Sequence, residues 1–342
     1  MSMIRGKREL LAHGVHGCGL TRLLNCVRKC DQLLVLNYHR IGSSGEDLFD
    51  PAVYSATPDR LSDQISYLKR HADMTTLDEA LALIDGKASP RARRCRVLLT
   101  FDDGYLDNYQ AAFPVLRAHK VHGVFFLVTQ LVGSCHLPWW DRIAYIMRTA
   151  RRRSFALHYP AYLAVNIDRD GIMISLREVL KLYKKPDMTD GEYFVGELLE
   201  VTRGDIPERT IRRFLNWEEA RDMLAHGMAI QSHTHSHTVL SQLSTAEQYK
   251  ELTVSRTILQ QELGTDINVL SYPVGIPTSF SEETCRIAQQ VGYRGAFSFY
   301  GGSNSVSALQ RYDIMRVGIG DQSWTRFRVQ TAVCRASGHF WP

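Results

Sequence analysis

The sequence predicts an α/β protein whose parallel strands curve into a barrel. Short apolar runs of strand length alternate with helical patterns across short connections, which is typical of parallel α/β folds. Polar residues able to carry chemistry follow the ends of several expected strands, and that edge holds the active site of an α/β barrel. No glycine-rich phosphate-binding run follows the first strand, which favours a barrel over a doubly wound sheet.

Each expected element follows from its hydrophobic period. Apolar runs of three to five residues indicate strands, and apolar residues three or four apart indicate helices. The expected strands are 33–37, 97–101, 124–128, 228–231, 269–272, 296–299 and 315–317, and the expected helices are 58–71, 77–84, 109–119, 217–225, 245–263 and 281–291. The predicted organisation is an N-terminal helical extension (1–32), a barrel (33–330) with a mixed insertion (131–213), and a C-terminal tail (331–342).

Composition limits the classes of function. The 342 residues are 44% hydrophobic and 23% charged with a formal net charge of +5, so a disordered chain is excluded and nucleic-acid binding is disfavoured. Charged and polar residues interrupt the apolar stretch 10–24, which argues against an export signal or a membrane span. We therefore expect a cytoplasmic protein, with peripheral membrane contact through a basic N-terminal helix as the alternative. The oligomeric state is not predicted.

Two adjacent carboxylates, Asp102 and Asp103, follow the apolar run 97–99 within Thr-Phe-Asp-Asp-Gly. Successive side chains of a strand point to opposite faces, so neighbouring acids share a site only where the strand ends. Two like charges held together are costly unless a cation or a proton relieves them. The pair therefore predicts a metal ion.

Three histidines at alternating positions, His233, His235 and His237, follow the expected strand 228–231. A turn after the strand brings His233 and His237 to one metal, whereas a straight strand places all three on one face. The alternative is a solvated histidine-rich loop. Imidazole and carboxylate ligands suit zinc, cobalt, nickel or iron better than calcium or magnesium.

With these residues, the chain resembles the NodB-homology polysaccharide deacetylases, carbohydrate esterase family 4, of the exopolysaccharide-associated type. The family's first motif, Thr-Phe-Asp-Asp-Gly, matches residues 100–104 in full. Its second motif, His-Ser/Thr-x-x-His, matches 233–237, and its third, which ends in Pro-x-Gly, matches 272–275 loosely. The resemblance implies a distorted, incomplete (β/α) barrel.

The resemblance also implies roles for single residues. Asp103, His233 and His237 would hold one divalent metal ion, Zn²⁺ first and Co²⁺, Ni²⁺ or Fe²⁺ otherwise. Asp102 would be the general base, and the backbone N–H of Val274 would stabilise the oxyanion.

The sequence departs from the family at two places. The late histidine that many members use as general acid is absent, and His39, in Tyr-His-Arg, is the substitute candidate, weighed equally against a structural histidine. The arginine that often precedes the third motif is replaced by Ser271, which leaves the partner of Asp102 unassigned.

Five residues are candidates for substrate binding. Adjacent tryptophans at the start of the insertion could stack on sugar rings, or could anchor the insertion on the barrel. The third motif and the middle histidine complete the set, which is Trp139, Trp140, Tyr272, Pro273 and His235.

The predicted function is metal-dependent hydrolysis of the N-acetyl group of an N-acetylhexosamine in a bacterial exopolysaccharide or its lipid-linked oligosaccharide precursor. Two alternatives stay open. One is a deformylase or deacetylase of a lipid-linked amino sugar, and the other is a catalytically silent glycan-binding barrel.

Overall fold

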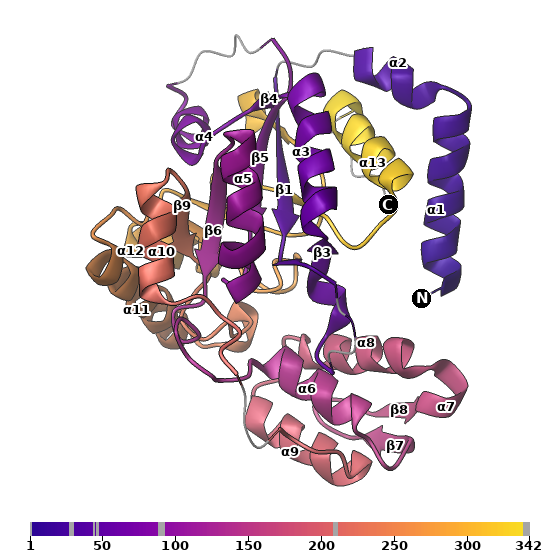
Figure 1. Ribbon diagram of the computed structural model, residues 1–342. Helices are drawn as coiled ribbons and strands as arrows, with labels where there is room; N and C mark the ends of the chain where they lie inside the picture. Colours follow the sequence, from indigo (N-terminus) through magenta and orange to yellow (C-terminus); the bar gives the residue numbers. More distant parts are fainter. Residues whose placement is uncertain are drawn as a thin grey trace.

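The computed structural model describes residues 2–26, 31–43, 45, 48–87, 93–207 and 211–337, with only the backbone described for 2–8, 22 and 26. One nine-stranded sheet organises the fold, and its central strands are parallel (Figure 1). In spatial order the parallel strands are β11 (Gly295–Phe297), β10 (Val269–Ser271), β9 (Ala229–Ser232), β6 (Gly123–Leu127), β5 (Arg96–Phe101), β1 (Gln32–Tyr38) and β13 (Arg316–Gly318).

The sheet curls until its two ends nearly meet. A single isolated parallel bridge joins Phe297 of β11 to Ile314, just before β13. Short strands β4 (Asp73–Met74) and β12 (Asn304–Ser305) extend the sheet beside β5 and β1. The predicted fold class, a distorted and incomplete (β/α) barrel, is confirmed.

Helices cover the outer face of the sheet, and their ends follow local sequence signals. The helices on the outer face are α3 (Pro58–His71), α5 (Phe113–His119), α10 (Trp217–Ala225), α11 (Thr245–Leu263) and α12 (Glu282–Val291). Helix α4 (Leu77–Ile84) instead packs Leu77, Ala80 and Leu81 against the side chains of the barrel interior. Capping boxes at Thr76, Asn216 and Ser244 satisfy the first free N–H groups of α4, α10 and α11. The expected helix 109–119 divides into a π-helical turn, Asn108–Ala112, and α5.

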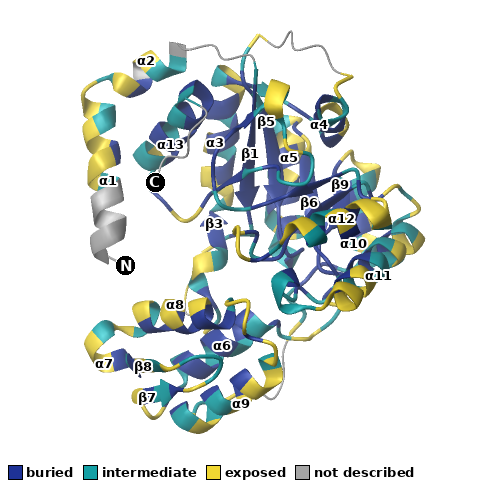
Figure 2. Ribbon diagram, turned by 180° about the vertical axis from the view of Figure 1, so that it is seen from behind, coloured by how far each residue is buried: buried dark blue, intermediate teal, exposed yellow. Residues whose placement is uncertain are grey.

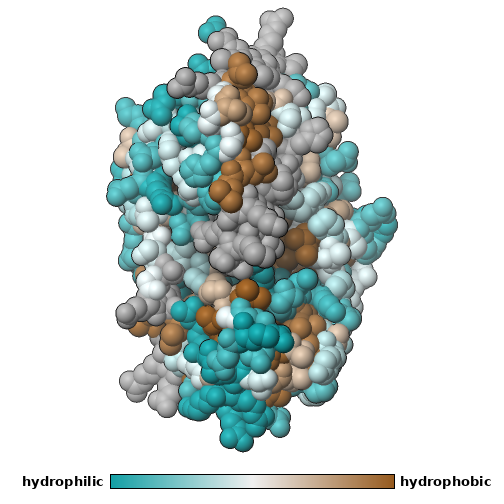
Figure 3. Space-filling model, turned by 90° about the vertical axis from the view of Figure 1, so that its right-hand side faces the viewer, coloured by the Kyte–Doolittle hydropathy of each residue, from teal (hydrophilic) through white to brown (hydrophobic). Residues whose placement is uncertain are grey.

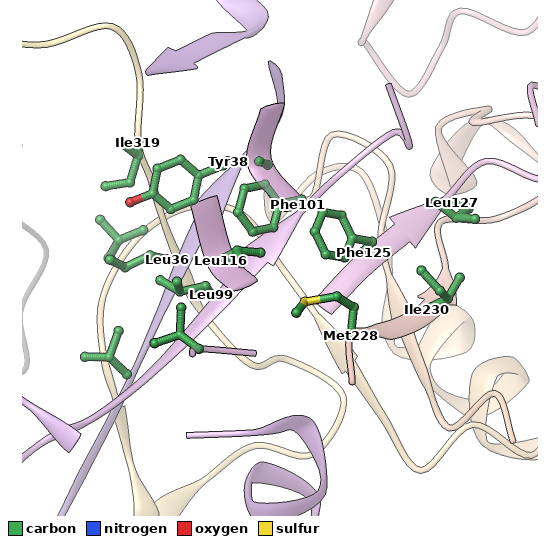
Figure 4. Close-up of a cluster of buried hydrophobic side chains, with 14 of the residues drawn as sticks. Leu36, Tyr38, Leu99, Phe101, Leu116, Phe125, Leu127, Met228, Ile230 and Ile319 are labelled. Atoms are coloured by element: carbon green, nitrogen blue, oxygen red, sulfur yellow. The ribbon is translucent and has the colours of Figure 1, made fainter. Parts of the chain in front are cut away.

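The strands alternate their side chains between two apolar layers, as the period of a strand requires. One set, from β1, β5, β6 and β9, packs under the helices. Figure 4 shows seven of these side chains, Leu36, Tyr38, Leu99, Phe101, Phe125, Leu127 and Ile230, together with Leu116 of α5, Met228 and Ile319. The other set fills the barrel interior with Val35, Leu98, Phe126, Val269 and Phe297. Both sets are dark blue in Figure 2, whereas the outer helix faces are exposed.

The insertion is a small region with its own core. Its elements are α6 (Trp139–Arg148), the antiparallel pair β7 (Ser154–Leu157) and β8 (Leu163–Asn166), α7 (Ile167–Asp170), α8 (Ile172–Tyr183) and α9 (Gly191–Thr202). Ile143, Val179 and Leu198 are fully buried between these elements. The region lies below the ends of β1 and β6 in Figure 1, so it faces the edge of the barrel where the strands end.

The terminal segments pack against each other. Helices α1 (Ser2–Gly17) and α2 (Leu20–Cys26) lie beside α13 (Trp324–Ser337). We expected a C-terminal tail from residue 331, but α13 continues through this point because Thr331, Cys334 and Arg335 are buried. Arg335 donates a 2.7 Å hydrogen bond to Asn25 Oδ1.

The N-terminal helices expose several leucines, and the molecular face on their side carries a hydrophobic strip (Figure 3). The exposed leucines of this segment are Leu10, Leu11, Leu20 and Leu23. Among the residues that the structure describes, no helix combines the length and hydrophobicity needed to span a bilayer. Membrane contact through this segment and a cytoplasmic location stay predictions.

Candidate active site

The two acids separate at the end of β5. The N–H of Asp102 still donates to Tyr38 O at 2.9 Å, so Asp102 continues the strand ladder. Asp103 then turns with a φ of 72°, and Gly104 follows at 74°. A Cβ at Gly104 would lie 2.7 Å from Leu127 Cδ2, so glycine is needed here. The turn gives the adjacent carboxylates different environments.

Asp102 forms a buried ion pair with Arg316 of β13. The guanidinium donates from Nη1 to Oδ1 at 2.8 Å and from Nη2 to Oδ2 at 2.9 Å. Asn37 and Ser271 also donate to Oδ2, at 3.0 and 3.3 Å. Arg316 itself is 1% exposed, and its Nε–H donates a hydrogen bond to Ser298 O. Asp102 is therefore held in one orientation.

The ion pair sets the charge of Asp102. Burial alone would raise the pKa of this carboxyl, but Arg316 and then His233 hold the pKa well below its ordinary value. Asp102 is therefore ionised throughout the neutral range. Arg316 is thus the partner of Asp102 that the sequence left unassigned. The ion pair could have been predicted from the arginine inside the expected strand 315–317, because a buried guanidinium requires an anion.

Asp103, His233 and His237 converge on one point. Their ligand atoms lie within 4.8 Å of one another, and all three side chains are buried. The Nε2 atoms of both histidines lie 3.4 Å from Asp103 Oδ1. His233 Nδ1 lies 2.8 Å from Ser271 O, which can only accept, so the Nδ1–H donates and leaves a lone pair on Nε2 of the neutral ring.

These three residues fit a divalent metal ion. Asp103 Oδ1 is buried and has no hydrogen-bond donor among the described residues, which is costly for a carboxylate oxygen without a cation. One carboxylate and two imidazoles match the ligand set of open zinc-type sites.

The protonation of the two imidazoles differs. Burial alone would lower the pKa of His233, but the charges of Asp102 and Asp103 raise it above the ordinary value. Burial and then the neighbouring His233 lower the pKa of His237 to about 3. His237 is therefore neutral, as a metal ligand must be.

The histidine loop curls, which separates His235 from the other two histidines. Thr234 and His237 have positive φ values of 66° and 61°, an uncommon conformation that concentrates at functional sites. His235 Nδ1 lies 2.9 Å from Thr129 Oγ1, and His235 is not among the residues that line the cavity. His235 thus lies beside Thr129, just after β6 and outside the cavity lining, and its role in substrate binding stays a prediction.

The third motif forms a strained turn at the cavity. Val274 has a φ of 64°, unusual for a β-branched residue, and its N–H donates to no acceptor among the described residues. Tyr272 packs its ring on Phe280 and donates its hydroxyl to Tyr312 O at 3.0 Å, so its side chain belongs to the core. Pro273 is outside the cavity lining. Tyr272 nevertheless contributes to the cavity lining, and substrate binding by Tyr272 and Pro273 stays a prediction.

Both tryptophans line the cavity and also support His237. The Trp140 ring lies 4.4 Å from the His237 ring, and its Nε1–H donates to Tyr105 Oη at 2.7 Å. Trp139 stacks on Tyr183 at 4.3 Å and donates to the backbone oxygen of His237 at 3.3 Å. The pair therefore anchors the insertion to the barrel while it presents aromatic surface to the cavity.

His39 lies on the cavity wall beside the two acids. Its N–H donates to Ser55 Oγ at 2.9 Å, and Asn108 donates to its carbonyl at 2.7 Å. Its ring meets Phe299 edge-on at 5.6 Å. The charge of His39 contributes to the pKa values of both Asp102 and Asp103, which places it within electrostatic reach of them.

These groups open into one cavity of about 720 Å³ between the barrel and the insertion. The barrel side supplies His39, the acid pair, the two converging histidines and Val274. The insertion side supplies Trp139, Trp140 and α8. A cavity of this size holds a ligand of one or two sugar rings.

The curled parallel barrel carries a buried Asp-His-His cluster that is a candidate metal site. The sequence model of the polysaccharide deacetylase family matches residues 90–159 and 160–296, so the chain belongs to this family. The Bacillus subtilis protein YxkH is 22% identical over 263 residues, which cover 77% of this chain and 63% of YxkH. Poly-beta-1,6-N-acetyl-D-glucosamine N-deacetylase of Staphylococcus epidermidis is 32% identical over 114 residues, 30% of this chain and 37% of that protein. The chain thus spans less than two thirds of these relatives.

Solved structures share the fold. The Streptococcus pyogenes deacetylase PplD, in complex with acetate, aligns with a TM-score of 0.58 at 18% identity over 88% of this chain and 98% of PplD. IcaB from Ammonifex degensii aligns with a TM-score of 0.55 at 19% identity over 90% of this chain and 98% of IcaB. Both structural alignments cover more of the chain than the family sequence model does.

Proposed function

We propose that the protein is a metal-dependent amide hydrolase that removes the N-acetyl group from N-acetylhexosamine residues of a bacterial exopolysaccharide or its precursor. The observation that carries the proposal is that the two adjacent acids have different surroundings. Asp103 faces two imidazoles with an unsatisfied oxygen, whereas Asp102 is ionised and held by Arg316. The similarity to the poly-beta-1,6-N-acetyl-D-glucosamine N-deacetylase of Staphylococcus epidermidis supports an N-acetylglucosamine polymer as the substrate class.

Asp103, His233 and His237 would hold the ion. A divalent ion in this site supplies Lewis-acid activation of the reacting amide. His233 is oriented for this role by its Nδ1 contact with Ser271 O, and His237 by the packing of Trp140. These supports limit the rotation of both rings.

Asp102 would accept the proton of the attacking water. Its Oδ1 accepts a single hydrogen bond among the described residues, from Arg316, so a lone pair remains for a second donor. Its low pKa keeps it in the accepting state. The free N–H of Val274 would donate to the oxygen of the tetrahedral intermediate.

His39 would protonate the departing amine. It lines the same cavity as Asp102, and its backbone is held by Ser55 and Asn108. No other histidine of the described chain lines the cavity besides the two that converge on Asp103. Breaking the C–N bond requires this proton, because an amide anion is too basic to leave.

Acetate release tests the proposal. Purified protein with Zn²⁺ is incubated with β-1,6-linked N-acetylglucosamine oligomers, and acetate and free amine are quantified. Asp102→Asn keeps the size of the side chain but removes the proton acceptor, so we expect kcat to fall by about 10²–10⁴-fold. Full turnover by Asp102→Asn would contradict the proposal. N-formyl substrates run in parallel distinguish a deformylase by its product.

A further inference from the structure

The cavity has a second functional wall, opposite the metal centre, formed by α8 and its C-cap. We call it the α8 wall, and its residues are Met173, Leu176, Arg177, Leu180, Lys181 and Lys184. Their spacing of three and four places them on one face of the helix. The wall therefore presents cations and hydrocarbon side by side to the substrate.

Positive charge exceeds negative charge on this wall. Arg177 and Lys181 are exposed at the rim, and Lys181 has only a long 3.9 Å contact with Glu178. Asp50, also in the cavity, is close enough to act on Lys184 and Arg177, but its Oδ1 accepts from Ala52 N. The three cations of the wall outnumber Asp50 and Asp103, whose charges act on Lys184, so an anion at the wall would meet net positive charge.

Lys184 is the least exposed cation of the α8 wall. It is half-buried, and its Nζ makes no hydrogen bond or salt bridge within the described part of the chain. The Nζ lies 5.8 Å from the centroid of Trp139, whose Nε1–H donates to the backbone of His237. One aromatic ring thus separates this ammonium group from a predicted metal ligand.

We propose that the α8 wall binds a phosphate of the substrate together with an adjoining hydrocarbon chain, so that the substrate is an N-acetylated sugar joined through phosphate to a lipid. This inference rests on the proposed function and narrows its substrate to the lipid-linked precursor. A neutral glycan offers hydroxyl groups, which bind best to carboxylates, amides and aromatic faces. Ammonium and guanidinium groups bind phosphate, and the partly exposed side chain of Met173 with the edge of Leu180 matches a hydrocarbon chain, whereas Leu176 belongs to the core of the insertion.

The test compares three substrates with the same reacting sugar: methyl N-acetylglucosaminide, N-acetylglucosamine 1-phosphate, and the 1-phosphate esterified with a short prenol. We expect kcat/KM to rise in that order, mainly through KM. Lys184→Met should reduce the preference for the 1-phosphate over the methyl glycoside by about 10- to 100-fold, the effect of one charge-assisted hydrogen bond. Lys184→Arg should keep most of the preference. Leu180→Ala should reduce only the rise in kcat/KM that the prenyl group gives and should leave the preference for the 1-phosphate over the methyl glycoside unchanged.

Lys250→Met, an exposed lysine on α11, is the matched control and should leave all three substrates unchanged. Equal kcat/KM for the neutral and phosphorylated sugars, or a preference that survives Lys184→Met, would overturn the inference. If the phosphate raises kcat/KM but the prenyl group does not, the part of the inference that assigns a lipid to the substrate would be overturned.

Failure of the proposed function is distinguishable from failure of this inference. If no substrate releases acetate, calorimetric titration with the prenyl ester of N-acetylglucosamine 1-phosphate still measures whether the α8 wall binds this ligand. Binding that weakens by about 10- to 100-fold in Lys184→Met supports the α8 wall, by the same charge-assisted hydrogen bond. Absent binding, or equal binding by both proteins, refutes it.

Discussion

Arg316→Met should destabilise the protein strongly, because it leaves Asp102 as a buried charge. The substitution removes both hydrogen bonds from the guanidinium to Asp102 and the bond to Ser298 O. Asn37 and Ser271 still donate to Oδ2, which limits but does not cancel the penalty. Removing one partner of a buried pair costs about 3–5 kcal/mol, so we expect a loss in this range at pH 7.

The loss should depend on pH. In the wild-type protein the pKa of Asp102 is lowered, so its stabilising contribution is present above the unfolded pKa and is lost as the pH falls through the folded pKa. In the variant, burial without Arg316 raises the folded pKa above the unfolded one. The loss in free energy of unfolding is therefore largest above that raised pKa and becomes smaller as the pH falls. The difference in free energy of unfolding between the wild-type protein and the variant should decrease at acidic pH.

Urea unfolding with a chelator present, at several pH values, measures this difference without a contribution from metal binding. Arg221→Met is the control, because Arg221 pairs with Glu262 at 3.3 Å on the surface and should cost less than about 1 kcal/mol. A loss for Arg316→Met no larger than that of the control would refute the reasoning. A loss that is the same at every pH would refute the assignment to Asp102.

Three further predictions concern the surroundings of the metal centre. Gly104→Ala should lower stability by about 1–3 kcal/mol, measured by thermal unfolding, because its Cβ would meet Leu127 Cδ2 and its φ is positive. Trp140→Phe should cost about 1 kcal/mol through loss of the bond to Tyr105, and Trp140→Ala about 3–5 kcal/mol; equal losses would contradict this packing. Metal affinity should weaken as the pH falls through the raised pKa of His233, because protons compete for Nε2, and competition titrations at two pH values should show it.

The order of strands and helices could be predicted because it depends on local hydrophobic period. The ends of α3, α4, α10 and α11 agree with the expected bounds, since capping residues mark them in the sequence. The convergence of Asp103 with His233 and His237 was also predictable, because the ends of parallel strands meet at one edge.

Two features of the site depend on tertiary geometry. Arg316 lies 214 positions from Asp102, and only the curling of the sheet brings β13 back to β1 and β5. The direction of His235 depends on the positive φ values of Thr234 and His237, which no alternation rule anticipates. A charged residue within an apolar strand indicated that Arg316 would need a buried anionic partner. Nothing in the sequence indicated the direction of the His235 side chain.

The central claim is that Asp103, His233 and His237 hold the divalent ion that deacetylation requires. The direct test measures Zn²⁺ binding and acetate release together for the wild-type protein, His237→Ala and His158→Ala, whose histidine is exposed on the insertion. We predict one tightly bound ion and acetate release for the wild-type and His158→Ala proteins. For His237→Ala we predict binding weaker by more than about 100-fold, with activity lost in parallel. Unchanged Zn²⁺ affinity and acetate release in His237→Ala would contradict the claim.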